Sequence, residues 1–196
     1  MKPRALPFVL SVLVVLSVLV SATANALRQP AEKGASQAET AVIGPTTREQ
    51  IESAVPEWVQ AEVEAQPDAE TARSLAAVAP GAEVTVFLGT WCGDSRREVP
   101  RLWKALAEAG FEVPFEIHYV GVDHAKKEPA SELAANDVHY LPTFIVHRDG
   151  RETGRIVETS PHGIERDLLD LLTNKARGVL ATREDVTSTA AAKPPR

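Results

Sequence analysis

In the middle of the chain, short continuous apolar runs alternate with stretches in which apolar residues recur every three or four positions. The runs predict strands, and the stretches predict helices. A β-branched run at 84–88, bounded by Pro80-Gly81 and Gly89, is typical of a buried strand. The next stretch, 96–109, has the i, i+3, i+4, i+7 stripe of an amphipathic helix, namely Val99, Leu102, Trp103 and Leu106. Because another strand is expected over 115–122, this stretch predicts a parallel strand–helix–strand unit with a right-handed crossover.

The flanking segments predict further helices and a hairpin. Thr47 and Gln50 form a capping-box pattern before a helix that Pro56 should kink or divide. The apolar stripe of that helix is Ile51, Val55, Trp58, Val59 and Val63. Short helices are expected over 69–79 and 129–137, and strands at 143–147 and 152–157 should pair about Asp149-Gly150. Ser160-Pro161 is expected to cap a last helix.

Composition and charge narrow the classes of function. The 196 residues are 44% hydrophobic and 24% charged, which are values typical of one globular domain with appendages. A formal net charge of −6 without a basic stripe argues against a nucleic-acid partner. The single cysteine excludes an internal disulfide and a multi-cysteine metal site, and Gly-rich phosphate-binding patterns are absent. We therefore predict no cofactor and no metal.

The N-terminal residues 1–26 have the form of an export signal. Lys2 and Arg4 precede an apolar run, and Ala24-Asn25-Ala26 fits a signal-peptidase site. The alternative is an uncleaved membrane anchor, because the charge-free stretch 5–27 reaches the ~20 residues that a span requires. We predict an exported domain, in the periplasm or cell envelope, that contacts a membrane only if this segment stays uncleaved. A flexible linker at 27–46 and a disordered tail at 182–196 are expected to flank it.

The only cysteine, Cys92, lies where the strand at 84–88 gives way to a helix. A helix N-terminus favours negative charge, so Cys92 is a candidate reactive thiol. The motif Trp91-Cys92-Gly93-Asp94-Ser95 resembles the Trp-Cys-Gly-Pro-Cys active site of thioredoxin-like proteins, with serine in place of the second cysteine. Pro100, Leu141-Pro142-Thr143-Phe144 and Asp149-Gly150 resemble the family's helix proline, cis-proline segment and last turn, in the family's order.

This resemblance implies both a fold and a binding groove. The fold is α/β and thioredoxin-like over 47–181, with a central mixed sheet of about four to five strands flanked by helices and a helical N-terminal extension. Pro142 is expected to be cis, with the backbone at Leu141 pairing with a partner chain; the alternative is a structural turn. Trp91 is expected to belong to the partner-binding surface, or to be a half-buried packing residue.

The missing second cysteine limits the chemistry. Cys92 can attack a disulfide, but Ser95 cannot resolve the mixed disulfide, so an external thiol is required. The pattern from Ser95 to Glu98 is a capping box, which favours a capping role for Ser95 over a catalytic hydroxyl. Asp94 can cap the same helix, although its charge opposes a thiolate unless Arg96 or Arg97 offsets it. Val86 stands where the family has a buried carboxylate.

Two functions follow from these features. The first is thiol–disulfide exchange through Cys92 with protein or small-molecule thiols and disulfides, and an exposed lone thiol also permits a Cys92-linked dimer. The second is a non-catalytic module that holds a partner peptide in the groove at Pro142. The five histidines are scattered, and His139 is nearest to Pro142 in the sequence, which leaves a base or a copper-type site as a further alternative.

Overall fold

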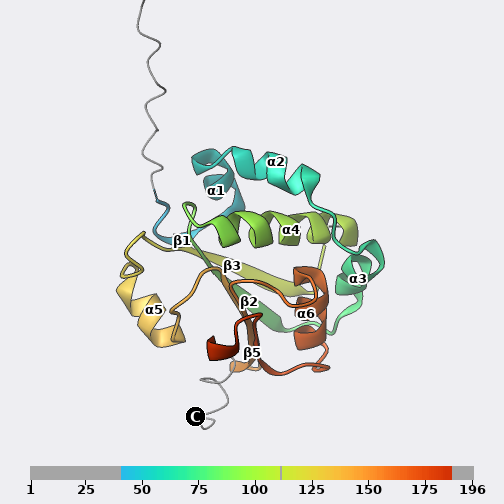
Figure 1. The fold of residues 1–196 in the computed structure, drawn as a ribbon. Helices are drawn as coiled ribbons and strands as arrows, with labels where there is room; N and C mark the ends of the chain where they lie inside the picture. The colour runs from blue at the N-terminus through green and yellow to red at the C-terminus, as the bar shows by residue number, and fades with distance from the viewer. Residues whose placement is uncertain (1–40, 111, 187–196) are drawn as a thin grey trace, which may run out of the picture. The chain divides into compact units, whose positions relative to one another are not determined.

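A six-stranded mixed sheet forms the centre of the domain in a computed structural model, which describes residues 41–110 and 112–186 (Figure 1). Its order is β1-β3-β2-β4-β5-β6. The strands are β1 (Gly44–Thr46), β2 (Ala82–Leu88), β3 (Phe115–Gly121), β4 (Thr143–Arg148), β5 (Arg151–Val157) and β6 (Gly178–Leu180). The expected sheet of about four to five strands is therefore corrected to six. The additional edge strands β1 and β6 have three residues each, too few to show a period in the sequence.

The helices occur where the apolar periodicity predicts them. They are α1 (Arg48–Ala54), α2 (Glu57–Glu64), α3 (Ala69–Ser74), α4 (Gly93–Ala109), α5 (Ala130–Asn136) and α6 (Ile164–Leu172), with a 3-10 turn η1 (Leu75–Ala77). The capping box at Thr47 is confirmed, because the Thr47 hydroxyl accepts from the Gln50 N–H while the Gln50 amide oxygen accepts from the Thr47 N–H. Pro56 divides the first predicted helix, as expected.

Alternate strand residues supply two apolar cores on opposite faces of the sheet. The first core contains Val84, Val86 and Leu88 of β2 and is covered by helices α1 to α4 and α6. Figure 1 shows α1, α2 and α4 together on this side. The second core contains Phe87 and is covered by α5 through Leu133. This period of two fixes which strand residues face each layer.

Two sequence expectations near the helices are wrong. Val59 and Val63 are 43% and 68% exposed, because the break at Pro56 changes the phase of the helix and only Trp58 of α2 is buried. Ser160 does not cap the last helix, whose N-cap is Gly163. The Ser160 hydroxyl instead donates to the buried carboxylate of Asp167, which also accepts from the backbone N–H of His162.

Part of the chain organisation lies outside the described residues. The expected export signal at 1–26, the linker as far as residue 40 and the tail from residue 187 belong to this part. The last three residues of the expected linker, 44–46, are ordered as strand β1, which pairs with β3. Within 41–110 and 112–186, no helix is long and apolar enough to cross a membrane.

Candidate thiol site

Cys92 is the N-cap residue of α4, the longest helix among the described residues. The chain leaves β2 at Leu88, and the Cys92 N–H donates to the Gly89 carbonyl across 2.9 Å. The Cys92 carbonyl in turn accepts the first helical bond from Arg96 at 3.0 Å. The side chain is partly buried at the margin of the second core. A strand, a tight turn and a helix start thus hold the sulfur at the end of β2, as the sequence predicts.

The Cys92 sulfur faces the segment that precedes β4. Its Sγ lies 3.5 Å from the Leu141 carbonyl oxygen, and the Leu141–Pro142 peptide bond is cis. The Leu141 side chain is 2% exposed and belongs to the second core. Leu141 therefore presents its backbone carbonyl to the sulfur, while its side chain lies in the second core. In the register of β2 with β4, Phe87 pairs with Thr143. The end of β2 and the start of β4 therefore lie side by side at the same end of the sheet, which brings Cys92 and Leu141 together.

Ser95 is not the cap of α4, which corrects the sequence expectation. The helix begins at Gly93, so Ser95 lies inside its first turn and is fully buried. Its Oγ accepts a hydrogen bond from the Gly89 N–H at 3.2 Å. A buried backbone N–H without an acceptor is costly, so the Ser95 hydroxyl stabilises the fold by accepting from Gly89. The position of the serine in the motif does not reveal this role. The hydroxyl braces the turn that carries Cys92.

Charged side chains on the first two turns of α4 form a connected group beside the thiol turn. Asp94 pairs with Arg97 at 2.9 Å, and Arg97 also bonds Glu98 and the Thr159 hydroxyl, at 3.0 and 2.7 Å. Arg97 thus offsets the charge of Asp94, as expected. Burial raises the pKa of Glu98, and the Arg97 guanidinium only partly opposes this effect. The group ties α4 to the loop that follows β5.

Trp91 lies against the second core and is fixed at two points. Its indole N–H donates to the Val122 carbonyl at 3.0 Å, and its ring stacks on His124 with 4.6 Å between centroids. A Cβ on Gly89 would lie 2.8 Å from the indole, so only glycine leaves room for this ring. The histidine that packs against the motif is therefore His124. His139, which the sequence places nearest to Pro142 among the histidines, is an exposed residue bonded to Asp137.

An apolar residue stands at the strand position where the resemblance implies a buried carboxylate. Val86 is fully buried in the first core at the position where the resemblance implies a carboxylate. Within the part of the chain that the structure describes, no three His, Cys, Asp or Glu side chains converge as metal ligands. Cys92, the single cysteine of the sequence, is the candidate nucleophile of this site.

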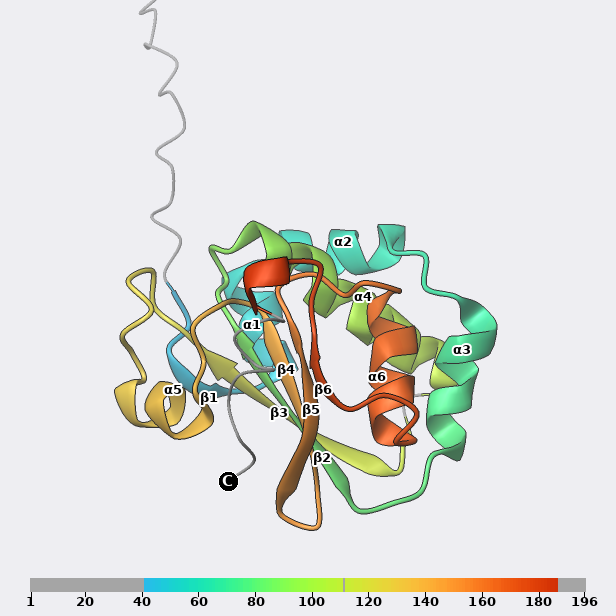
Figure 2. The same ribbon diagram turned by 60° about the horizontal axis from the view of Figure 1, so that its bottom comes forward.

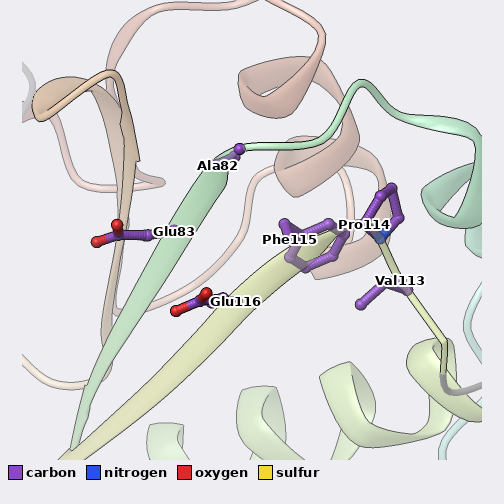
Figure 3. Close-up of a pocket in the computed structure, with 7 residues that line it drawn as sticks. Ala82, Glu83, Val113, Pro114, Phe115 and Glu116 are labelled. Atoms are coloured by element: carbon purple, nitrogen blue, oxygen red, sulfur yellow. The ribbon is translucent and has the colours of Figure 1, made fainter.

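A pocket of about 290 Å³ lies at the other end of the two parallel strands (Figure 3). It is lined by 81–83 at the start of β2 and 113–116 at the start of β3, whereas Cys92 follows the end of β2. Glu83 and Glu116 pair in register, and Figure 3 shows their carboxylates on the same side of the strands. This pocket is separate from the thiol site.

Known proteins provide a comparison for this arrangement. No protein-family model matches the chain. Mitochondrial thioredoxin-3 of Saccharomyces cerevisiae is 27% identical over 86 residues, which are 43% of this chain and 61% of that protein. A thioredoxin-like protein of Acanthamoeba polyphaga mimivirus is 29% identical over 90 residues, or 46% of this chain and 62% of that protein. A solved Pseudomonas aeruginosa protein of unknown function has a TM-score of 0.45 at 18% identity, over 65% of this chain and 86% of that one.

Both curated relatives are thioredoxins or thioredoxin-like proteins by name. The chain is similar in sequence to members of the thioredoxin-like superfamily. It spans about three fifths of the length of the two curated relatives, at 61% and 62%. The sequence similarity therefore covers part of each relative.

Proposed function

We propose that this chain is an exported, single-cysteine thioredoxin-like protein that exchanges disulfides through Cys92. One observation carries the proposal: the sulfur stands at the start of a long helix, partly exposed, 3.5 Å from the Leu141 carbonyl beside a cis X-Pro bond. A helix N-terminus favours the negative charge that a nucleophilic sulfur carries. A partner sulfur that bonds to Cys92 would lie beside the Leu141–Pro142 backbone.

The reaction has two balanced steps. The Cys92 thiolate attacks one sulfur of a partner disulfide, forms a mixed disulfide and releases the other partner sulfur as a thiolate that takes up a proton. An external thiol then attacks the partner sulfur of the mixed disulfide, forms a new disulfide with it and releases Cys92. Ser95 takes part in neither step, because an alcohol oxygen cannot form or resolve a disulfide. The partners are protein or small-molecule thiols and disulfides.

Replacing Cys92 with serine is expected to abolish covalent capture while leaving the fold intact. Incubation with glutathione disulfide should add one glutathionyl group to the wild-type protein and none to Cys92→Ser, as read by intact-mass spectrometry. Added reduced glutathione should remove the group. Oxidation without a small thiol should link two wild-type chains through Cys92, which a non-reducing gel detects. A wild-type protein that stays unmodified while folded would contradict exchange and leave a binding role for the groove.

Export is proposed from the N-terminal sequence. A basic start, an apolar run and the Ala24-Asn25-Ala26 site favour cleavage after Ala26. The mature protein recovered from the cell envelope should therefore begin at Leu27, as N-terminal sequencing will show. A membrane-bound product that retains Lys2 would instead identify an uncleaved anchor.

A further inference from the structure

The C-terminal end of the described chain lies at the same end of the strands as the thiol site. Strand β6 runs parallel to β5, with Gly154 opposite Gly178 and Ile156 opposite Leu180. Strand β5 runs antiparallel to β4, which begins directly after Pro142. Residues 181–186 therefore emerge where β5 ends and β4 begins. Figure 2 shows this red segment at the same end of the sheet as the loop that joins β5 to α6.

Arg183 connects this segment to two others that meet at Pro142. Its guanidinium lies 4.8 Å from the centroid of the Tyr140 ring, and its Nη1 lies 3.2 Å from a Glu158 carboxylate oxygen. Glu158 donates its N–H to the Pro142 carbonyl at 2.8 Å. Tyr140 precedes the Leu141 carbonyl that faces Cys92 Sγ. Arg183 thus bridges the residues on either side of the segment beside the sulfur.

We propose that residues 181–186 form a strap that limits which disulfides reach Cys92, and that Arg183 is the positioning residue that fastens it. This inference rests on the proposed function of Cys92. Because the sulfur faces the Leu141 carbonyl, a partner cysteine in an extended chain has to bring its neighbouring residues along 140–142. The strap borders that path at Tyr140 and Glu158. A small disulfide can reach the sulfur without lying along residues 140–142. The strap therefore slows peptide disulfides more than small-molecule disulfides.

The contacts that hold the strap are weak. The Arg183 and Glu158 side chains are 46% and 18% exposed, and an ion pair with one partner so exposed is weak and screened by salt. A cation over a half-exposed aromatic ring, here Tyr140, adds a similarly small contribution. The strap is therefore expected to open in solution often enough to admit a chain, but to slow its entry.

The test compares two maleimides on the full chain, since alkylation requires only an accessible sulfur. N-ethylmaleimide is the small probe, and a maleimide attached to an extended peptide is the large one. Arg183→Ala should raise the rate with the peptide probe about fivefold, as expected for losing weak exposed contacts, and leave the rate with N-ethylmaleimide unchanged. High salt should accelerate the peptide probe on the wild-type protein but not on Arg183→Ala.

Arg166→Ala is the matched control, because Arg166 is 53% exposed and pairs with Asp170 at 3.2 Å on α6. This variant should leave both rates at wild-type values. Equal rates for Arg183→Ala and wild type with the peptide probe would overturn the strap, as would an equal acceleration of both probes. Failure of Cys92 to form a mixed disulfide with glutathione would contradict the proposed exchange instead, and the alkylation rates would still report on the strap.

Discussion

Replacing Ser95 with cysteine is expected to give Cys92 an internal resolving thiol. Ser95 lies in the first turn of the helix that Cys92 caps, and its Oγ points back to the Gly89 N–H of the same turn. The two sulfurs would then be joined by a short loop, for which effective concentrations are about 1 mM or more. With external thiol at about 10 μM, release of a Cys92 mixed disulfide should accelerate at least about a hundredfold.

The measurement starts from glutathionylated protein and follows its mass with time after dilution. Ser95→Cys should lose glutathione at a rate that does not depend on external thiol and should end as an internal disulfide. Ser95→Ala is the control, since it removes the hydroxyl without adding a sulfur and should release glutathione as slowly as wild type. Its cost in stability is about 1 kcal/mol, because the Gly89 N–H loses its acceptor.

A Ser95→Cys protein that is folded yet keeps its mixed disulfide as long as wild type would show that position 95 does not reach Cys92. In that case the likeness of this motif to a two-cysteine site would be one of sequence only. The opposite result would show that a single atom, oxygen in place of sulfur, sets the need for an external thiol.

The central unit of the fold could be predicted because its signals are local. Each signal lies within a short stretch of sequence: the apolar run of β2, the apolar stripe of α4 and the turn at Asp149-Gly150. The turn is confirmed by positive φ angles of 52° and 69° at its two central residues, a conformation that favours Asp and Gly there. The position of Cys92 at a helix start followed from the same local signals.

The features that sequence reasoning missed depend on contacts between distant segments. The stacking of His124 on Trp91 requires the loop after β3, where the Asp123 carboxylate accepts backbone N–H groups of Ala125, Lys127 and Glu128. The role of Ser95 required the start of α4 to be known to within two residues, which capping preferences alone do not fix.

Removing the Arg101 guanidinium is expected to destabilise the domain more than removing any exposed charge on the same helix. Glu165 is 1% exposed and accepts two bonds from Arg101, at 2.7 and 2.9 Å, and one from the Asp68 N–H at 2.9 Å. Arg101→Met would leave this carboxylate buried without its counter-charge, at a cost of about 3 kcal/mol. Lys104→Met is the control, because Lys104 and Glu108 form a half-exposed pair at 3.5 Å whose loss costs about 0.5 kcal/mol or less.

The pH dependence of stability distinguishes the contribution of the Glu165 charge from the contribution of its packing. Burial would raise the pKa of Glu165, but the bonds from Arg101 and Asp68 outweigh it and lower that pKa below 4.5. Its charge therefore stabilises the folded state above pH 4.5, and this contribution is lost as pH falls through the lowered value. The raised pKa of Glu98 acts in the opposite direction, but it is common to wild type and variant and cancels in their difference.

The difference in unfolding free energy between wild type and Glu165→Gln should be largest near about pH 7 and shrink as the solution becomes more acidic than about pH 4. Urea titrations at several pH values measure it. A difference that stays constant with pH would mean that glutamine loses only shape or hydrogen bonds, and the charge would then contribute nothing. A decreasing difference, together with a large cost for Arg101→Met, would identify this pair as the electrostatic link between α4, α6 and the start of α3.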